Sequence, residues 1–464
     1  MADTARMDAI ASAPPRANRW AIRLGSALIP VAHATGQNIV TVLGLRFMTD
    51  SLAISAGTAG LIFALVKIYD GVLDPAVGAL SDRVRTPWGR RLPFLLAGGV
   101  AMPLGILMLF GAPDMGSVLL AQLFVTLALI IHASGYTLLT IPGFAMVVES
   151  SPDPHERTRL MGWRVYGNAA GLLIGTTVPG LILARMGPGR HAHLVMASAI
   201  GAVVLLATVL AVRLLARAPR TAPPEHPRPF NLVAQSRLAW LNRPFRILAI
   251  THVFLLFGTA IGSAALAYFS RYVLRAPDNW LSGYFLFSTI GMVGSIPGWV
   301  VFSRVIGKKS GYIIAMALFG LVNLTWLLAG PGELAAFSNL RGFLSGVAGG
   351  GTILCAYAML SDAVRYDFVC SGERREGVFA GFTTLLDKLS SAAALAAMGA
   401  FLSAMGYVSS SMGGPIAQSV QAIHAVAICV AVVPAVSMLA GIMTVSRYQL
   451  QPDDLIENAL PGEA

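Results

Sequence analysis

The chain has 464 residues, of which 56% are hydrophobic and only 12% are charged, and its mean hydropathy is +0.70. Soluble domains carry about 25% charged residues, so this composition excludes an ordinary water-soluble protein and indicates a chain that lies in a lipid bilayer. The net charge of +11 follows the loops between apolar segments, so we expect no nucleic-acid partner. Three cysteines are too few and too scattered for a disulfide framework or a metal cluster.

The apolar residues form twelve blocks that are long enough to cross a bilayer, which requires roughly 20 residues per helix. Because hydrocarbon offers the backbone no hydrogen-bond partners, each block is predicted to be a helix. The predicted spans are 24–45, 58–81, 93–111, 118–146, 162–184, 194–215, 246–270, 281–303, 311–330, 339–362, 378–404 and 421–444.

Most of the 33 Lys and Arg residues precede the first span or follow an even-numbered span. The opposite loops hold only Arg46, Arg185, Arg190, Arg271 and Arg275. The positive-inside rule then places both termini in the cytoplasm. We expect a multi-pass protein of the cell inner (plasma) membrane. The residues before Trp20 lack the apolar core of a signal peptide, so we expect the first helix to be retained.

The longest inner loop, 216–244, contains six prolines and several arginines, a composition typical of a linker. The expected parts are an N-terminal tail (1–23), a six-helix bundle (24–215), the linker (216–244), a second six-helix bundle (245–445) and a C-terminal tail (446–464). Two pseudo-symmetric six-helix bundles make up the all-α major facilitator fold, whose halves rock about a site at mid-membrane.

The second span carries two acids, Asp70 and Asp74, one helical turn apart and therefore on one face. Two like charges this close in an apolar bundle repel each other, and a shared cation, a shared proton or a nearby lysine would relieve them. Lys67 lies on nearly the same side. The alternative is a buried ion pair that only holds helices in register. We favour a cation site, because intramembrane acids are usually functional.

The eleventh span contains Lys388, its only basic residue at depth. It is expected to face the bundle interior, where it could balance Asp70 or Asp74 from the opposite half of the protein. The alternative is a static pair with its neighbour Asp387, although adjacent helical residues point about 100° apart.

The roles of other polar residues are predicted from the span or loop in which each one lies. The turn after the second span contains Asp82, Arg83, Arg90 and Arg91, whose links we expect to form and break as the cytoplasmic side closes and opens. Arg164, in the fifth span, either reaches the membrane surface or donates hydrogen bonds into a central cavity. His252 is expected to be a satisfied packing residue. The glycine-rich run 346–351 is expected to serve close helix packing or bending rather than phosphate binding.

Two stretches of the sequence together resemble one family. Asp70-Gly71-Val72-Leu73-Asp74-Pro75, followed by Asp82-Arg83 and Trp88-Gly89-Arg90-Arg91, is similar to the signature of the glycoside–pentoside–hexuronide:cation symporters, the family of melibiose permease. The stretch from Met359 through Asp362 to Gly377 resembles the family's loop before the eleventh span. Lys388, Arg164 and Ile141-Pro142 also match in position.

The resemblance implies that Asp70 and Asp74 ligate Na⁺, Li⁺ or a proton, that Lys388 completes the cation site, and that Arg164 faces a sugar. It also implies a gating role for Asp362. The family's sugar-binding acids come from the first and fourth spans, and neither is present here. The candidates at those places are Gln37 and Asn38, and Thr140 and Phe144, which would hold sugar hydroxyls more weakly than carboxylates would.

The function predicted from the sequence is alternating-access symport of a sugar or glycoside with Na⁺ or H⁺, by a monomer in the bilayer. No cofactor beyond the coupling ion is expected, and no motif of an enzyme is present. Two alternatives stay open: the same scaffold carrying a non-sugar amphipathic substrate such as a lysolipid, and a membrane sensor that has lost transport.

Overall fold

The computed structural model describes residues 19–150, 154–187, 189–216, 237, 240–277, 279–371, 376–410 and 417–450. Twelve helices in these ranges are long and apolar enough to cross a membrane, which confirms the number and order of the predicted spans, although several helices extend beyond the predicted limits. Most of each expected tail (1–18 and 451–464) and residues 217–236 of the expected linker lie outside the described residues.

Each half of the chain supplies six of the spanning helices. The first half contains α2 (Arg19–Ser51), α3 (Ala56–Arg83), α4 (Leu92–Phe110), α5 (Val118–Glu149), α6 (Pro154–Met186) and α7 (Arg190–Leu215). The second half contains α9 (Arg243–Tyr268), α10 (Trp280–Ile306), α11 (Lys308–Leu324), α12 (Ala335–Ser371), α13 (Glu376–Ala404) and α14 (Val420–Val445). The short helices η1 (Phe269–Val273, π) and η2 (Thr325–Leu328, 3₁₀) extend α9 and α11.

Several helix ends are fixed by local side-chain caps. The side chain of Ser55 accepts a hydrogen bond from the backbone N–H of Thr58 at the start of α3. Asn242 caps α9 in the same way, and Ser419 caps α14. Such caps satisfy backbone donors that the first helical turn leaves without partners. The turn between α10 and α11 is made by Gly307 at φ 87°, a conformation that favours glycine.

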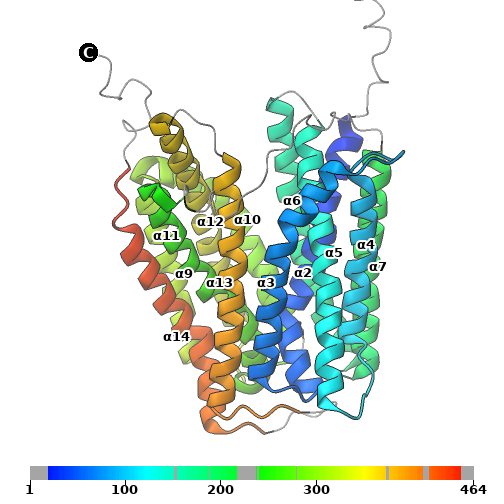
Figure 1. Cartoon of the computed structure of the whole chain (residues 1–464). Helices are drawn as coiled ribbons and strands as arrows, with labels where there is room; N and C mark the ends of the chain where they lie inside the picture. The colour runs from blue at the N-terminus through cyan, green and yellow to red at the C-terminus, as the bar shows by residue number, and fades with distance from the viewer. Residues whose placement is uncertain are drawn as a thin grey trace, which may run out of the picture.

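The two halves share one packing plan. In the first half α4 packs on α5 and α7, and α2 packs on α6 and α7. In the second half the helices at the equivalent places do the same: α11 packs on α12 and α14, and α9 packs on α13 and α14. The two halves stand side by side in Figure 1. This repetition is the internal pseudo-symmetry of the major facilitator fold.

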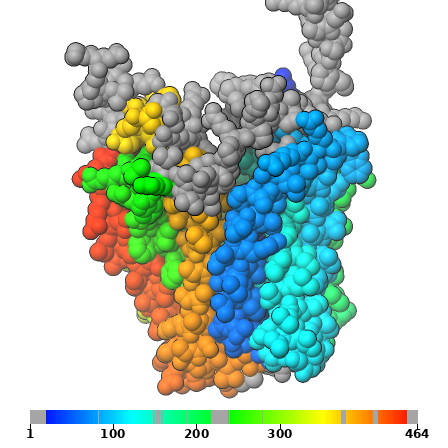
Figure 2. Space-filling view, viewed as in Figure 1, coloured from blue at the N-terminus to red at the C-terminus, as the bar shows by residue number. Residues whose placement is uncertain are grey.

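Two helix pairs form most of the contact between the halves: α3 packs on α13, and α6 packs on α10. Figure 2 shows α13 (orange) lying directly against α3 (blue) over much of the viewed face. Glycines permit this approach: a Cβ on Gly399 would lie 2.3 Å from the carbonyl oxygen of Ala56, and one on Gly60 would lie 2.5 Å from that of Leu395. Small residues at such crossings let backbones come close together, as is usual between membrane helices.

Candidate functional site

The two carboxylates of α3 meet a lysine from the opposite half of the protein. Lys388 Nζ, on α13, lies 3.0 Å from Asp70 Oδ2 and 2.5 Å from Asp74 Oδ2. It also donates a hydrogen bond of 2.9 Å to the backbone oxygen of Asp70. The side chain of Asp70 is only 1% exposed, and that of Lys388 only 10%. A buried ammonium between two carboxylates therefore joins the halves at this point, as expected from the sequence.

A hydroxyl links the same two carboxylates from the other side. Thr137, on α5, lies 2.7 Å from Asp70 Oδ1 and 2.9 Å from Asp74 Oδ1 through its Oγ1. A hydroxyl has one proton to donate, so it can serve only one carboxylate at a time. No sequence pattern distinguishes this residue from the other hydroxyl residues of the spans. Thr126, Ser134 and Thr140 lie on the same helix, so only the fold reveals that it is Thr137 that faces the acids.

The charges in this cluster balance. Lys67 Nζ lies 4.0 Å from Asp70 Oδ2, so two lysines face two carboxylates. Ion pairs of this kind need good geometry to offset the loss of hydration in a buried site. The oxygen atoms of Asp70, Asp74 and Thr137 are ligands that suit a hard cation, and the acids can also take up a proton. The position between the two acids is, however, held by Lys388.

The alternative pairing of Asp387 with Lys388 is wrong. Asp387 Oδ1 lies 2.6 Å from Nε2 of His252 on α9, within its own half of the protein. Because the two residues are consecutive on α13, they point to different sides of the helix. Lys388 faces α3, whereas Asp387 faces into the second bundle. His252 was expected to be a packing residue, and its partner was not anticipated.

The predicted substrate residues all lie on α2, α5 and α6 of the first half. Arg164 donates a hydrogen bond of 3.4 Å to the carbonyl of Gly143 and stacks over the ring of Phe144 at 5.5 Å. Phe144 is itself 53% exposed. These two predicted residues are therefore in contact.

The three polar candidates Gln37, Asn38 and Thr140 make their hydrogen bonds within their own helices. Gln37 donates to the hydroxyl of Thr41, and Asn38 donates to the carbonyl of Ala34. Thr140 donates to the carbonyl of Tyr136. All three are half-buried. Their roles toward a substrate stay predictions.

The predicted gating residues are described only in part. The guanidinium of Arg91 lies 3.4 Å from the hydroxyl of Ser81 at the end of α3, Arg83 is exposed, and Arg90 is half-buried. Asp362, on α12, pairs with Lys308 at 2.6 Å, within the second half. The side chain of Asp82 and the stretch 372–375 lie outside the described residues.

A second polar cluster joins the halves where α2 and η1 end, at the membrane end opposite to the start of α2 (Figure 1). Asp50, near the end of α2 and 5% exposed, accepts hydrogen bonds from Tyr407 at 2.6 Å and from Tyr272 at 3.0 Å. Arg271 lies 3.7 Å from the same carboxylate. The hydroxyl of Ser410 donates to the backbone oxygen of Asp50 at 2.7 Å. We call these five residues the Asp50 cluster.

The backbone around the Asp50 cluster is unusual in two places. Tyr272 and Arg271 lie in η1, a π-helical turn, and such turns are rare and often functional. Ala53, just after α2, has φ 55° and donates its N–H to the carbonyl of Ser410 at 2.9 Å. A positive φ is uncommon for a non-glycine residue, so the surrounding contacts must hold it. The predicted first span ended at residue 45, which left Asp50 in a loop and hid this contact.

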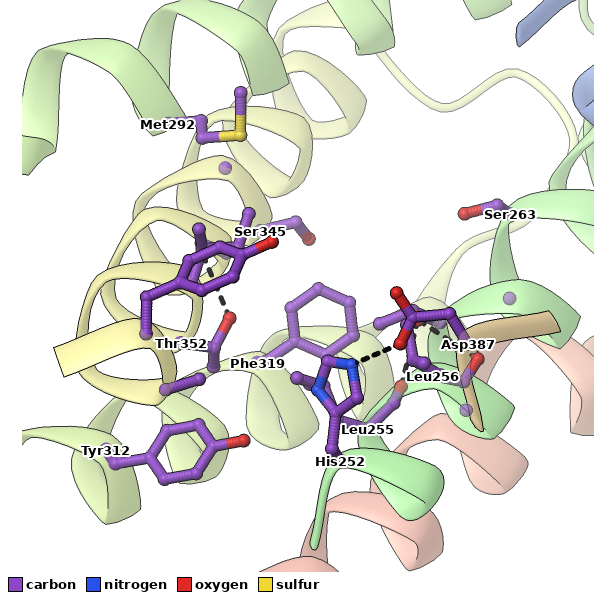
Figure 3. Close-up of a pocket in the computed structure, with 18 of the residues that line it drawn as sticks. His252, Leu255, Leu256, Ser263, Met292, Tyr312, Phe319, Ser345, Thr352 and Asp387 are labelled. Atoms are coloured by element: carbon purple, nitrogen blue, oxygen red, sulfur yellow. Dashed lines mark hydrogen bonds and ion pairs between the residues drawn. The ribbon is translucent and has the colours of Figure 1, made fainter. Parts of the chain in front are cut away.

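The second half encloses a pocket of about 490 Å³ between α9, α10, α11, α12 and α13. Figure 3 shows Asp387 and Ser263 on one side of it and Thr352, Ser345 and Met292 on the other. Its surface is mostly apolar. The pair His252–Asp387 is part of its lining, one residue away from the lysine of the acid cluster.

Residues 25–452 match the family described as MFS/sugar transport protein. The chain belongs to this family. Among its relatives, Inner membrane symporter YicJ of Escherichia coli (strain K12) is 26% identical over 427 residues, which cover 90% of this chain and 88% of YicJ. The isoprimeverose transporter of Lactiplantibacillus pentosus is 24% identical over 415 residues, which cover 88% of this chain and 84% of that protein.

A solved bacterial homologue of the human drug peptide transporters PepT1 and PepT2 has the same fold, with a TM-score of 0.66 at 13% identity. The match covers 92% of this chain and 98% of that one. Membership of the glycoside–pentoside–hexuronide:cation symporter family, first indicated by the Asp70–Asp74 motif, is confirmed. The chain is thus a multi-pass membrane transporter of the sugar/cation symporter type and not an enzyme.

Proposed function

We propose that this protein carries a sugar or glycoside together with Na⁺ or H⁺, and that the coupling ion binds at Asp70 and Asp74. The observation that carries the proposal is the position of Lys388 Nζ, within 3.0 Å of both carboxylates and contributed by the other half. Because this ammonium contacts the acids from the opposite half, near the middle of both helices, the protonation or ion occupancy of the acids would depend on the relative position of the two bundles.

The geometry supports an exchange between the lysine and the coupling ion. Two lysines already neutralise the two acids, so an added cation would leave a net positive charge in a buried site, which is costly. Binding of the cation must therefore displace the ammonium of Lys388 from the carboxylates. In the empty carrier Lys388 would take the place of the ion and keep the site neutral.

Alternating access then needs contacts that seal one side of the membrane at a time. The Asp50 cluster supplies such contacts between α2, η1 and the segment after α13. By the positive-inside rule, the end that carries it is the outer one, and both termini are cytoplasmic. We propose that the Asp50 cluster closes the outer side while the inner side is open, and that it separates when the carrier faces outward.

The substrate is proposed to lie against the first half, near Gln37, Asn38, Thr140, Phe144 and Arg164. An exposed aromatic ring beside a guanidinium offers an apolar face for a sugar ring and several donors for its hydroxyls. None of these five residues is an acid, so binding would rest on the guanidinium of Arg164 and on neutral hydrogen bonds, without the carboxylates that the resemblance associates with sugar binding. The carrier is proposed to act as a monomer in the lipid bilayer, with no cofactor besides the coupling ion.

The test is uptake by proteoliposomes under an imposed gradient of Na⁺ or of H⁺, with a panel of labelled monosaccharides and glycosides. The proposal predicts that at least one compound accumulates above its outside concentration, and that an ionophore for the driving ion abolishes the accumulation. Uptake that only equilibrates, with either gradient and every compound, would contradict cation coupling.

A further inference from the structure

We infer that the pocket in the second half is a binding site for an organic cation, such as a quaternary ammonium or phosphonium ion that carries aryl or alkyl groups. The observation that carries this site is one carboxylate, that of Asp387, whose side chain is 45% exposed in a cavity with mostly apolar walls. The site goes beyond the proposed symport of a sugar and does not depend on it, because its residues lie on α9–α13 and its ligand can be tested without a sugar.

The charge of the pocket comes from a single side chain. Among the described residues that line it, Asp387 is the one carboxylate, and lysine and arginine do not occur. The lining contains one imidazole, that of His252, whose Nε2 lies 2.6 Å from Asp387 Oδ1. A neutral imidazole can donate one hydrogen bond but carries no charge. With His252 neutral, the lining has one net negative charge, which an occupant with one positive charge would balance.

The neighbouring lysine does not supply this positive charge. Lys388 follows Asp387 on α13, but its ammonium lies 3.0 Å from Asp70 Oδ2 and 2.5 Å from Asp74 Oδ2, outside the pocket. The second oxygen of Asp387, Oδ2, has no hydrogen bond or ion pair with any described residue. A carboxylate oxygen beside apolar walls is costly unless water or a counter-ion compensates it.

Aromatic rings form much of the wall around this carboxylate. Figure 3 shows the rings of Tyr312 and Phe319 on the pocket wall together with the His252–Asp387 pair. The face of an aromatic ring is electrically negative and attracts a cation that lies within about 6 Å of the ring centre. Recognition of quaternary ammonium ions commonly uses such rings. Six aromatic side chains from α9, α10, α11 and α12 line the pocket: Phe245, Tyr284, Phe285, Tyr312, Phe319 and Tyr357.

The same walls disfavour a metal ion. A bare metal ion needs several oxygen, nitrogen or sulfur ligands to replace its hydration shell. In the described part of the chain, no group of three or more His, Cys, Asp or Glu side chains is suited to hold one. An organic cation needs no such set, because its charge is surrounded by alkyl or aryl groups that themselves gain by leaving water.

The hydrogen-bonding groups of the pocket also disfavour a ligand rich in hydroxyls. Three threonines of the lining use their donors within their own helices: Thr259 donates to the carbonyl of Leu255, Thr352 to that of Gly349, and Thr383 to that of Phe379. A quaternary cation requires no hydrogen bonds, so it leaves no polar group without a partner. The volume of about 490 Å³ lies within the range of roughly 300–1,000 Å³ that is typical of small-molecule sites.

The experiment measures binding of tetraphenylphosphonium and of the smaller benzyltriethylammonium by calorimetry at pH 8. The protein is held in nanodiscs of zwitterionic lipid in sodium phosphate, because Tris and choline are themselves organic cations. Tetraphenylborate, which has nearly the shape of tetraphenylphosphonium and the opposite charge, controls for partition into apolar surroundings, and empty nanodiscs are the blank. We expect at least one of the two cations to bind the wild type, and tetraphenylborate not to bind above the blank.

Asp387→Asn removes the charge and keeps an acceptor for His252. It should weaken binding of the cation by about tenfold or more, the order expected for one charge a few ångströms from another at a partly exposed site. Asp387→Glu should retain most of the affinity. Asp114→Asn is the matched control, because it removes one negative charge at an exposed position between α4 and α5 that does not line the pocket.

A second pair of variants tests the place of binding. Ala356→Phe fills the pocket from α12 and should abolish binding of the cation, whereas Ala336→Phe makes the same change on the same helix at an exposed position outside the pocket and should not. If Asp387→Asn does not yield a monodisperse protein, this pair carries the test together with tetraphenylborate.

Three results would overturn the inference: no binding of either cation by the wild type, equal affinity of the wild type and Asp387→Asn, or binding that survives Ala356→Phe. Binding of tetraphenylborate as tight as that of tetraphenylphosphonium would also overturn it, because the pocket would then select for apolar surface and not for charge. Gradient-driven sugar accumulation by a wild type that binds neither cation would refute this site and leave the proposed function intact.

Discussion

Replacement of Lys388 by methionine tests the role of the ammonium between the acids. Methionine keeps most of the length of the side chain and removes the charge. The change removes contacts to both carboxylates and to the backbone oxygen of Asp70, and leaves two like charges adjacent in a buried site. Breaking a buried ion pair on one side typically costs about 3–5 kcal/mol, so we expect a loss of stability of that order at pH 8 without a coupling ion.

The same variant should respond more strongly to the coupling ion than the wild type does. A cation that binds the folded state at 100 times its Kd stabilises it by about 2.7 kcal/mol, which would restore much of the loss in Lys388→Met. In the wild type the ion must first displace the lysine, so its apparent affinity should be weaker. Thermal unfolding in nanodiscs, titrated with NaCl against choline chloride and repeated at lower pH, measures both effects.

Two other lysines serve as controls for this experiment. Lys67 lies 4.0 Å from one carboxylate, so Lys67→Met should cost less than Lys388→Met. Lys309 is half-buried and donates one exposed hydrogen bond to the backbone oxygen of Ser446, so Lys309→Met should change stability by no more than about 0.5 kcal/mol. The reasoning is refuted if Lys388→Met unfolds at the wild-type temperature without a coupling ion, or if neither Na⁺ nor acid stabilises it more than the wild type.

Three further predictions concern Thr137, Asp50 and Glu156. Thr137→Val removes the hydroxyl shared by the two acids and should weaken the apparent affinity for the coupling ion by about 10–100-fold, the usual worth of a hydrogen bond to a charged group, whereas Thr137→Ser should retain it; equal affinities for the two variants in flux assays would exclude the hydroxyl. Asp50→Asn weakens the acceptor of two tyrosine hydroxyls and should increase outward opening by about tenfold or more, seen as faster labelling of cysteines placed between α2 and η1 from the outer side; unchanged labelling would show that the cluster does not close that side. Hydrogen bonds from Arg23 hold the pKa of Glu156 below its ordinary value, so their contribution to stability is present above that value and is lost as the pH falls through the lowered pKa; the stability difference between wild type and Glu156→Gln should thus be constant near neutral pH and vanish in acid, and a difference that persists there would contradict the assignment.

The spans and the acid pair could be read from the sequence because they depend on local chemistry. Apolar blocks must be helices in lipid, and a spacing of four residues must place Asp70 and Asp74 on one face. The approach of Lys388 could also be inferred, since an isolated buried charge requires an opposite one and few were available. These inferences needed only the cost of charge in an apolar medium.

The remaining features depend on contacts between distant segments, which hydropathy does not encode. Thr137 is one of several hydroxyl residues in apolar spans, and only packing decides which of them faces the acids. Asp50 lies beyond the apolar part of the first span, so a limit drawn by hydropathy excluded it although the helix continues to Ser51. The partner of Asp387 is His252, which lies 135 positions away, so no local pattern of the sequence indicates the contact.

The central claim is that Asp70 and Asp74 energise transport, and the most direct test compares two modes of transport in one Asp74→Asn preparation. Accumulation against a gradient requires the coupling ion, whereas exchange of labelled for unlabelled substrate at equal concentrations requires only that the loaded carrier can reorient. We predict that Asp74→Asn loses accumulation driven by Na⁺ or H⁺ and keeps measurable exchange. Wild-type accumulation by Asp74→Asn under the same gradient would contradict the account.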